Sequence, residues 1–472
     1  MVNIICTLIK YINIILIVLY TYYCFSIFSY SDVEKKQMVL FRQNIVTFFF
    51  QFFSFATMYL ITEDIYYLGL YVALAIMSVA TILFYVKIYP NVSRLILNNM
   101  CMLFSLGMIM ICRLNFSLAV KQFLIFSVSM VISLFVPVII RKVRFLSEFS
   151  WVKVYAGVGI VALLLVAVLA QTSYGAKLGF EIMGVNIQPS EFVKIIYVFF
   201  VAGSMYHSTK FKNVVITTVL AAAHVLILVV STDLGAAVIL YVVYLVMLYV
   251  ATKNWFYAGA GLAAGAMASV VAYHLFSHIQ VRVEAWADPF AAYSTGGYQV
   301  AQSLFAIGTG GWVGFGLFQG APDTIPVAES DFIFSAIAEE MGLIVGLCLI
   351  MICVSCYVMF LNIAMQIRNK FYKLIALGLG TCYIFQVFLT IGGVTKFIPS
   401  TGVTLPLVSY GGSSLLSTLI MFAIIQGLYI LREDEEDDIE KHRKNNLRRE
   451  RTQSSKTSAR SAGRDASRPR KR

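Results

Sequence analysis

The sequence predicts an all-α fold, a polytopic bundle of transmembrane helices. Composition, the length of the apolar runs and the placement of positive charge all support this prediction. Of the 472 residues, 60% are hydrophobic and 13% are charged, and the mean hydropathy is +0.82. A typical soluble domain is about half apolar and a quarter charged. The apolar surface of this chain therefore requires lipid.

Thirteen segments satisfy the requirement of a membrane-spanning helix for about 20 mostly apolar residues. They are 8–30, 41–62, 65–88, 95–113, 118–140, 152–171, 190–207, 213–231, 233–252, 255–277, 331–360, 371–394 and 407–431. Only Ser231-Thr232-Asp233 separates the eighth segment from the ninth.

Positive charge predicts how these helices are oriented, because cytoplasmic loops are enriched in Lys and Arg. With the N-terminus outside, 15 of the 36 Lys and Arg residues fall in inner loops and 6 in outer loops. A further 14 follow the last span, and Lys194 lies within one. We therefore expect the N-terminus outside and the C-terminus inside. The charge forms no basic stripe interleaved with aromatics, which argues against a nucleic-acid partner and favours membrane lipids.

Two loops interrupt the apolar pattern, and both fall on the outer side of the predicted topology. These are 172–189 and the much longer 278–329, which is rich in Gly, Pro and aromatic residues. Long loops that lack the composition of disordered segments are usually functional. The segment 433–472 differs, since its dense charge predicts a disordered cytoplasmic tail.

Asp331 follows the long loop directly, at the start of a predicted span. Ser330 can cap that helix, and an acid in the first turn is favoured by the helix dipole. The same carboxylate can instead serve as a general base if burial raises its pKa. Glu339 and Glu340 are expected about 12–14 Å deeper in the same helix, as a structural pair with backbone or Lys contacts.

Two other groups of residues are candidates for chemistry. Glu191 and Lys194 share one helix face, and either a structural or a functional pair fits them. Arg282, Trp286 and Asp288 in the long loop suit an anionic, sugar-bearing substrate. The glycine run 308–316 lacks the Lys-Ser/Thr ending of a nucleotide loop, so we expect tight turns or close backbone approach there.

Several motifs of the chain occur together in one order between about residues 95 and 432. They are Gly175-Ala176, Gln188-Pro189-Ser190-Glu191 to Lys194, Asp233-Leu234-Gly235, Trp286 with Asp288-Pro289, Gly297-Tyr298-Gln299, Ser330-Asp331-Phe332-Ile333-Phe334 with Glu339-Glu340, and Leu405-Pro406-Leu407-Val408-Ser409-Tyr410-Gly411-Gly412. In these motifs the chain resembles the SEDS family of RodA, FtsW and SpoVE.

The resemblance implies a domain organisation, because the family core has ten spanning helices. Residues 1–94 are then an N-terminal extension of three membrane helices, 95–432 the catalytic core with its extracellular loop 278–329, and 433–472 the tail. The family core starts inside, which gives the same orientation as the charge count.

The resemblance also implies an activity, that of a peptidoglycan glycosyltransferase in the bacterial cytoplasmic membrane. Such an enzyme polymerises lipid II into glycan strands and releases undecaprenyl diphosphate. Asp331 matches the family's essential Asp, the proposed base. Arg282, Trp286, Asp288, Glu191, Lys194, Asp233, Glu329, Ser409 and Tyr410 are expected to bind substrate or support the site.

No dedicated metal cage is evident in the sequence. Mg²⁺ or Mn²⁺ is expected only where substrate phosphates and one or two carboxylates, Asp331 and Glu329, would hold it. The expected partners are a class B penicillin-binding protein, which is a transpeptidase, and other elongation or division proteins.

Two other functions fit the same residues, a flippase or transporter for the lipid-linked precursor and a non-catalytic scaffold. The chain departs from the usual family pattern at Leu178, Glu329 and Ser231-Thr232. Glu329 matters most, since a second carboxylate near Asp331 can raise its pKa or recruit a metal.

Overall fold

The computed structural model describes most of the chain. The described residues are 2–142, 144–169, 172–173, 176–177, 179–182 and 185–436. Among the predicted motif residues, Gly175 and Leu178 lie outside this part, as do the tail residues 437–472.

Twelve helices of the described part are long and apolar enough to cross a membrane. They are α1 (Val2–Ser26), α2 (Val33–Thr62), α3 (Tyr66–Ile88), α4 (Arg94–Leu114), α5 (Phe116–Lys142), α6 (Phe149–Leu169), α8 (Phe211–Val230), α9 (Leu234–Thr252), α10 (Trp255–Leu275), α14 (Leu343–Gln366), α15 (Lys370–Val394) and a last helix, Gly412–Glu436. The predicted helical membrane bundle is confirmed.

The remaining elements do not combine the length and the apolar composition of these twelve. Helix α7 (Pro189–His207) corresponds to the expected span 190–207 and carries two charged residues, Glu191 and Lys194. The long loop contains α11 (Ser277–Ala287) and α12 (Tyr298–Gly310), and α13 (Ile333–Glu340) follows it. Two small antiparallel pairs lie between α6 and α7. In them β1 (Thr172–Ser173) pairs with β2 (Ala176–Lys177), and β3 (Phe180–Ile182) pairs with β4 (Val185–Ile187).

One predicted span, 331–360, is wrong as a continuous helix. The structure divides it into α13 and α14 at Met341-Gly342, where Gly342 has a φ of +94°. Arg113, next to the end of α4, contacts Glu340. Glu340 therefore lies at the end of the bundle and not two turns inside it. The expected break between α8 and α9 is confirmed.

The last helix also differs from its expected bounds, 407–431. It begins at Gly412, because residues 400–411 form turns and irregular backbone, and it continues to Glu436. The first four residues of the predicted tail, 433–436, are thus helical.

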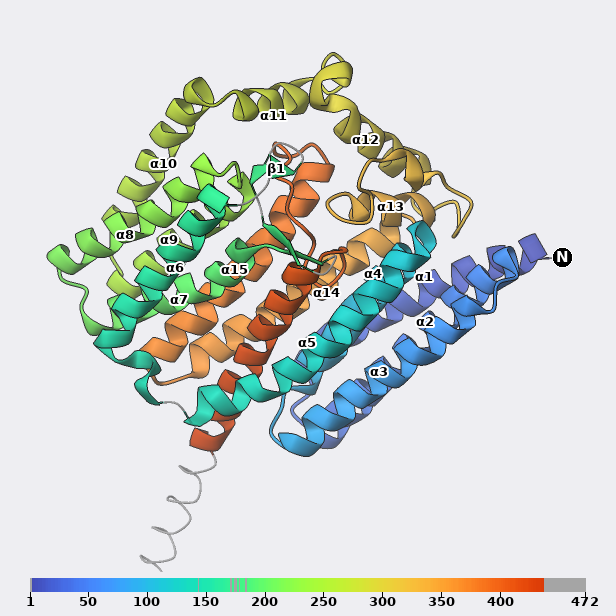
Figure 1. The fold of residues 1–472 in the computed structure, drawn as a ribbon. Helices are drawn as coiled ribbons and strands as arrows, with labels where there is room; N and C mark the ends of the chain where they lie inside the picture. The colour runs from blue at the N-terminus through green and yellow to red at the C-terminus, as the bar shows by residue number, and fades with distance from the viewer. Residues whose placement is uncertain are drawn as a thin grey trace, which may run out of the picture.

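Helix α4 is at the centre of one half of the bundle, and every residue from Leu95 to Cys112 is buried. Helices α2, α3, α5 and α14 pack around it, and Figure 1 shows α1–α3 together on one side of the molecule. Helices α10, α11 and α12 form an arch along the top of the molecule, which ends next to α13 (Figure 1).

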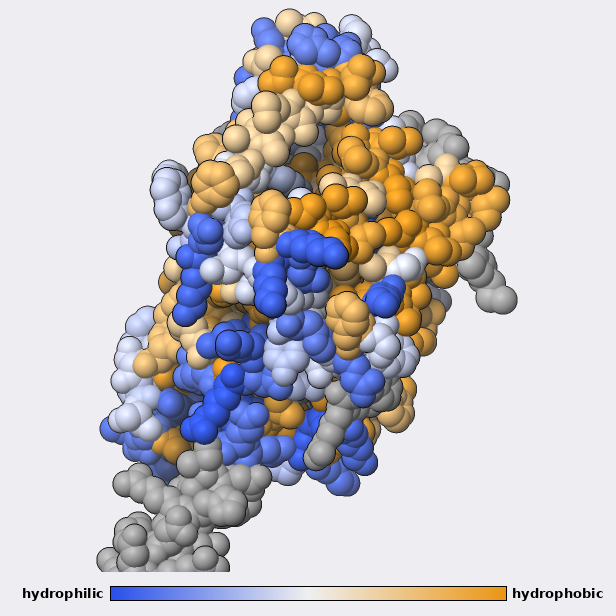
Figure 2. Space-filling model, turned by 90° about the vertical axis from the view of Figure 1, so that its left-hand side faces the viewer, coloured by the Kyte–Doolittle hydropathy of each residue, from blue (hydrophilic) through white to orange (hydrophobic). Residues whose placement is uncertain are grey.

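The arch and its neighbours expose much apolar surface. Helix α10 has no buried residue, and its exposed side chains include Trp255, Phe256 and Met267. Figure 2 shows hydrophobic residues over the upper part of this face and hydrophilic residues gathered below them. Exposed apolar side chains on long helices are what a lipid bilayer covers. The chain is a multi-pass membrane protein.

Candidate active site

Asp331 lies in the turn that leads into α13, at the same end of the bundle as α11 and α12. The side chain is half-buried, and its Oδ1 accepts a hydrogen bond from Ser330 Oγ at 3.0 Å. Helix α13 begins at Ile333, and no side chain caps it. The prediction that Ser330 caps this helix is therefore wrong. Its hydroxyl donates to Asp331 instead.

Arg282 of α11 and Asp331 both lie next to Gly402. A Cβ on Gly402 would stand 3.4 Å from Asp331 Oδ2 and 3.9 Å from each terminal nitrogen of Arg282. Arg282 also donates from Nη1 to the carbonyl oxygen of Ser400 at 2.9 Å. Gly402 has a φ of +71°, a conformation that glycine adopts without steric cost. The backbone can thus pass close to both the carboxylate and the guanidinium.

Ser409 and Tyr410 hold the backbone next to Asp331. The Ser409 hydroxyl donates to the carbonyl oxygen of Ser330 at 2.5 Å and accepts from the Leu405 N–H at 2.8 Å. The Tyr410 N–H donates to the carbonyl oxygen of Glu329 at 2.8 Å. We name residues 400–411 the site loop, since it contacts both Asp331 and Arg282. Ser409 and Tyr410 thus position the carboxylate of Asp331 through hydrogen bonds to the carbonyl oxygens of the two residues before it.

Four effects act on the pKa of Asp331. Burial raises it, the Ser330 hydrogen bond and the positive charge of Arg282 lower it, and the negative charge of Glu329 raises it. The net result is a pKa above the ordinary aspartate value. Burial lowers the pKa of Arg282, and the negative charges of Asp331 and Asp233 oppose this shift. The charges of two carboxylates therefore act on the guanidinium.

Asp233 is bound by residues of two helices. Its Oδ1 accepts from the Ala236 N–H at 3.1 Å and caps α9, while its Oδ2 accepts from Ser190 Oγ at 2.8 Å and Gln188 Nε2 at 3.2 Å. Asp233 thus connects the start of α7 to the start of α9. Its negative charge also acts to raise the pKa of Arg282.

Glu191 and Lys194 form an enclosed ion pair on α7. Lys194 Nζ lies 2.9 Å from Glu191 Oε2, and the two side chains are 2% and 9% exposed. Ser417 donates to the same Glu191 oxygen at 2.9 Å, and Lys194 donates to Gln386 at 2.8 Å. A buried pair with further hydrogen-bond partners in the protein favours the structural interpretation. Gln386 in turn donates to the carbonyl of Thr404 in the site loop at 3.0 Å.

Trp286 and Asp288 are more exposed than the residues above. Trp286 Nε1 donates to the carbonyl of Lys396 at 3.2 Å, which fastens α11 next to the site loop. Asp288 Oδ1 accepts from the backbone N–H groups of Phe290 and Ala291, both at 3.0 Å. Asp288 therefore stabilises a turn of the long loop.

The expected backbone contact is confirmed at Glu339, whereas an arginine and not a lysine pairs with Glu340. Glu340 Oε1 accepts from Arg113 Nε at 2.8 Å, and Glu339 Oε1 accepts from the Ala321 N–H at 2.8 Å. Gly402 and Gln386 were missed as site residues. In the sequence, Gly402 is marked only by its position four residues before Pro406. A glycine at such a spacing is too common to identify a site residue.

The described residues contain no group of three or more His, Cys, Asp or Glu side chains arranged for a metal ion. Asp331 and Glu329 supply two carboxylates within one turn of chain, and Arg282 already supplies positive charge beside them. These residues fit a cation that is held jointly by one or two carboxylates and a substrate diphosphate. They do not fit a site in which protein ligands alone complete the coordination of the ion.

Sequence comparisons with known proteins show which family the chain belongs to. The cell cycle protein family of FtsW, RodA and SpoVE matches residues 93–433. The peptidoglycan glycosyltransferase RodA of Mycobacterium tuberculosis is 36% identical over 364 residues, which cover 71% of this chain and 77% of that protein. A probable peptidoglycan glycosyltransferase FtsW of Aliivibrio salmonicida is 30% identical, covering 58% and 72%.

Solved structures show the same fold. A chain from a peptidoglycan synthase complex that coordinates polymerization and crosslinking has a TM-score of 0.61 and 23% identity, covering 72% of this chain and 98% of its own length. The Thermus thermophilus rod shape determining protein RodA has a TM-score of 0.53 and 21% identity, covering 72% and 96%. The chain belongs to the FtsW, RodA and SpoVE family of cell cycle proteins.

Proposed function

We propose that this protein is a peptidoglycan glycosyltransferase that polymerises lipid II into glycan strands at the outer face of the cytoplasmic membrane. Family membership and the named activity of the mycobacterial relatives support this proposal. The structural observation that carries it is that Asp331 and Arg282 both lie next to Gly402 at one end of a membrane bundle.

Asp331 is the general base in this proposal. The sugar hydroxyl of the lipid-linked acceptor attacks the anomeric carbon of the growing strand, and Asp331 takes the hydroxyl proton. The new C–O bond forms as the bond between the anomeric carbon and the diphosphate breaks. A carboxylate with a raised pKa suits this role, because a general base is most effective when its pKa approaches the working pH.

Arg282 binds the leaving group in this proposal. Breaking the glycosyl–phosphate bond leaves negative charge on the undecaprenyl diphosphate, and a fixed guanidinium stabilises such charge by paired hydrogen bonds. Ser400 and Asp233 keep the guanidinium in place. Mg²⁺ or Mn²⁺ bound by Asp331 and Glu329 would add positive charge at the same diphosphate.

The remaining site residues support this reaction. Ser409 and Tyr410 fix the backbone of Asp331, and Trp286 fastens α11 against the segment before the site loop. A class B penicillin-binding protein is the proposed crosslinking partner, in agreement with the synthase complex that shares this fold.

Purified protein in detergent tests the proposed activity directly. Incubated with lipid II, it should yield glycan strands and undecaprenyl diphosphate, separable by gel electrophoresis and chromatography. In liposomes, movement of lipid II between leaflets without any polymer would show a flippase and contradict the proposal.

A further inference from the structure

Helices α1–α3 precede the part of the chain that the family covers, which begins at residue 93. We call residues 2–92 the extension. Helix α1 packs against α2 and α14, and α2 packs against α4, so the extension covers one side of the core (Figure 1). Nothing in the reaction proposed above gives it a role.

Buried hydrogen bonds fix the extension to the core. Tyr20 of α1 donates to Asn99 Oδ1 of α4 at 3.0 Å, and Asn99 Nδ2 donates to Ser355 of α14 at 3.2 Å. Gln51 of α2 donates to Ser105 of α4 at 2.6 Å. In a membrane interior such polar contacts join helices, because the alternative is a polar group in hydrocarbon. The extension therefore has one defined position on the core.

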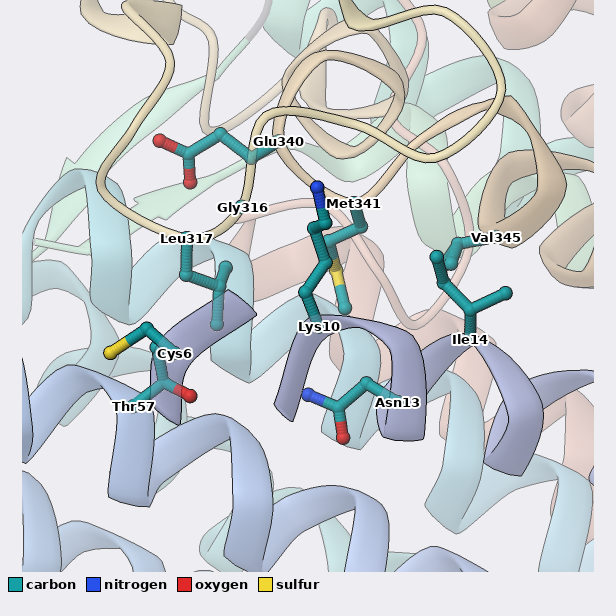
Figure 3. A pocket seen from close by; sticks show the side chains of 10 residues that line it. All are labelled: Cys6, Lys10, Asn13, Ile14, Thr57, Gly316, Leu317, Glu340, Met341 and Val345. Atoms are coloured by element: carbon teal, nitrogen blue, oxygen red, sulfur yellow. The ribbon is translucent and has the colours of Figure 1, made fainter. Parts of the chain in front are cut away.

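Lys10 of α1 reaches from the extension to the loop between α12 and α13. Its Nζ donates to the carbonyl oxygen of Gly314 at 3.2 Å. A cavity of about 20 Å³, room for one water molecule, lies between Lys10, Asn13, Gly316, Glu340 and Met341. Figure 3 shows the Lys10 side chain extending from α1 toward Met341 and the Gly316–Leu317 turn.

Gly314 belongs to a segment that holds the junction of α13 and α14. The N–H groups of Phe315 and Gly316 donate to the carbonyls of Glu339 and Glu340 at 3.0 and 2.8 Å. In the other direction, the N–H of Leu343 donates to the carbonyl of Gly311 at 3.0 Å. We call residues 311–316 the brace.

The brace touches the end of α13, and Asp331 lies two residues before its start. Helix α13 has eight residues and thus spans only about 12 Å at 1.5 Å per residue. A displacement of its last turn therefore moves its first turn as well, since so short a helix moves as one body. These contacts together form a continuous path from Lys10 through the brace and α13 to Asp331.

We propose that Lys10 is a positioning residue for the glycosyltransferase site, acting through the brace on α13 and hence on Asp331. The extension then forms part of the catalytic apparatus without touching substrate. The link to catalysis rests on the function proposed above, whereas the link from Lys10 to α13 does not.

Three variants of the full chain test this inference. Lys10→Met removes the donor and keeps the side-chain length, and Lys10→Arg keeps a donor. Lys121→Met is the matched control, because Lys121 is an exposed lysine in the first turns of α5. Amide hydrogen exchange of residues 333–340 is measured by mass spectrometry in detergent, alongside lipid II polymerisation.

Lys10→Met should speed exchange in α13 on the order of tenfold, the factor expected from one lost charged hydrogen bond, and should lower kcat at unchanged KM. Lys10→Arg and Lys121→Met should match the wild type in both measurements.

Unchanged exchange in Lys10→Met would overturn the inference, and so would faster exchange spread over every helix. Faster exchange confined to α13 with normal kcat would overturn the catalytic link. If the wild type makes no polymer, the proposed function fails, and exchange still decides whether Lys10 positions α13.

Discussion

Asp331 is surrounded by groups that act on its charge in opposite directions. Burial and Glu329 favour the protonated form, and Ser330 and Arg282 favour the carboxylate. Ser330 binds Oδ1, whereas Oδ2 lies on the side of Gly402 and Arg282. The oxygen that faces Arg282 is thus the one placed to take a proton from a substrate held by that guanidinium.

Glu329→Gln should shift the pH dependence of polymerisation. The charge of Glu329 raises the pKa of Asp331, so its removal lowers that pKa. The base form of Asp331 exists above its pKa, and the acidic limb of a kcat/KM profile should therefore move to lower pH. Glu284→Gln is the control, since Glu284 is exposed on α11. An acidic limb that stays in place or moves upward in Glu329→Gln would disprove the electrostatic coupling.

At the scale of the elements, glycines decide how α12, α13 and α14 meet. Gly314 has a φ of +70°, and a Cβ there would stand 2.3 Å from the carbonyl oxygen of Glu340. Gly342, at the break between α13 and α14, has a φ of +94°. The expectation that the glycine run serves tight turns and close backbone approach is confirmed at Gly314.

Gly314→Ala should destabilise the protein by roughly 1–3 kcal/mol, the usual range for strained backbone. The methyl group would collide with α13 and force a conformation that L-residues rarely adopt. Gly308→Ala is the matched control, because a Cβ at that helical position meets nothing within 4 Å. Thermal unfolding in detergent compares the two variants. Equal midpoints would show that the close approach at Gly314 is not required.

Hydropathy predicted the long helices well and the break between α13 and α14 poorly. Ser231-Thr232-Asp233 interrupts the apolar pattern, so α8 and α9 could be separated from sequence. Before Gly342, Glu339 and Glu340 also interrupt the apolar pattern, but the backbone change at the glycine itself leaves no trace in hydropathy. Glu339 and Glu340 were consequently placed too deep, and Arg113 was missed as the partner of Glu340.

At the scale of the whole molecule, the extension and the core share buried polar contacts. Asn98 donates to Gln43 at 3.0 Å and Asn99 accepts from Tyr20 at 3.0 Å. Both asparagines belong to α4, and the partners Gln43 and Tyr20 belong to the extension, while Asn99 also donates to Ser355 of α14 within the core. Without α1–α3 these amides would face lipid, where an unpaired polar group is costly.

Deleting residues 2–92 should therefore lower the unfolding midpoint of the core. Asn98→Leu with Asn99→Leu should partly restore stability in the truncated chain, because apolar side chains suit a lipid-facing surface. The same two substitutions should destabilise the full-length chain, where they remove buried hydrogen bonds. If they destabilise both chains equally, the extension does not cover this face of α4.

The assembly of the site was only partly predictable. Motifs indicated Asp331, Arg282, Asp233, Ser409 and Tyr410 one by one. Their meeting could not be predicted, because it depends on the site loop, which contacts Arg282 across 118 positions of sequence and the backbone of Ser330 across 79. Hydropathy and local spacing carry no information on such distant contacts. The orientation of the termini stays a prediction from the charge count.

The most direct test of the account is lipid II polymerisation by Asp331→Asn. The substitution keeps the size of the side chain and removes its capacity as a base, so polymerisation should fall by about 10²–10⁴-fold with little change in unfolding midpoint. Asp323→Asn is the control, since Asp323 is an exposed carboxylate near the same end of the bundle. Wild-type rates in a folded Asp331→Asn protein would contradict the central claim that this carboxylate takes the acceptor proton.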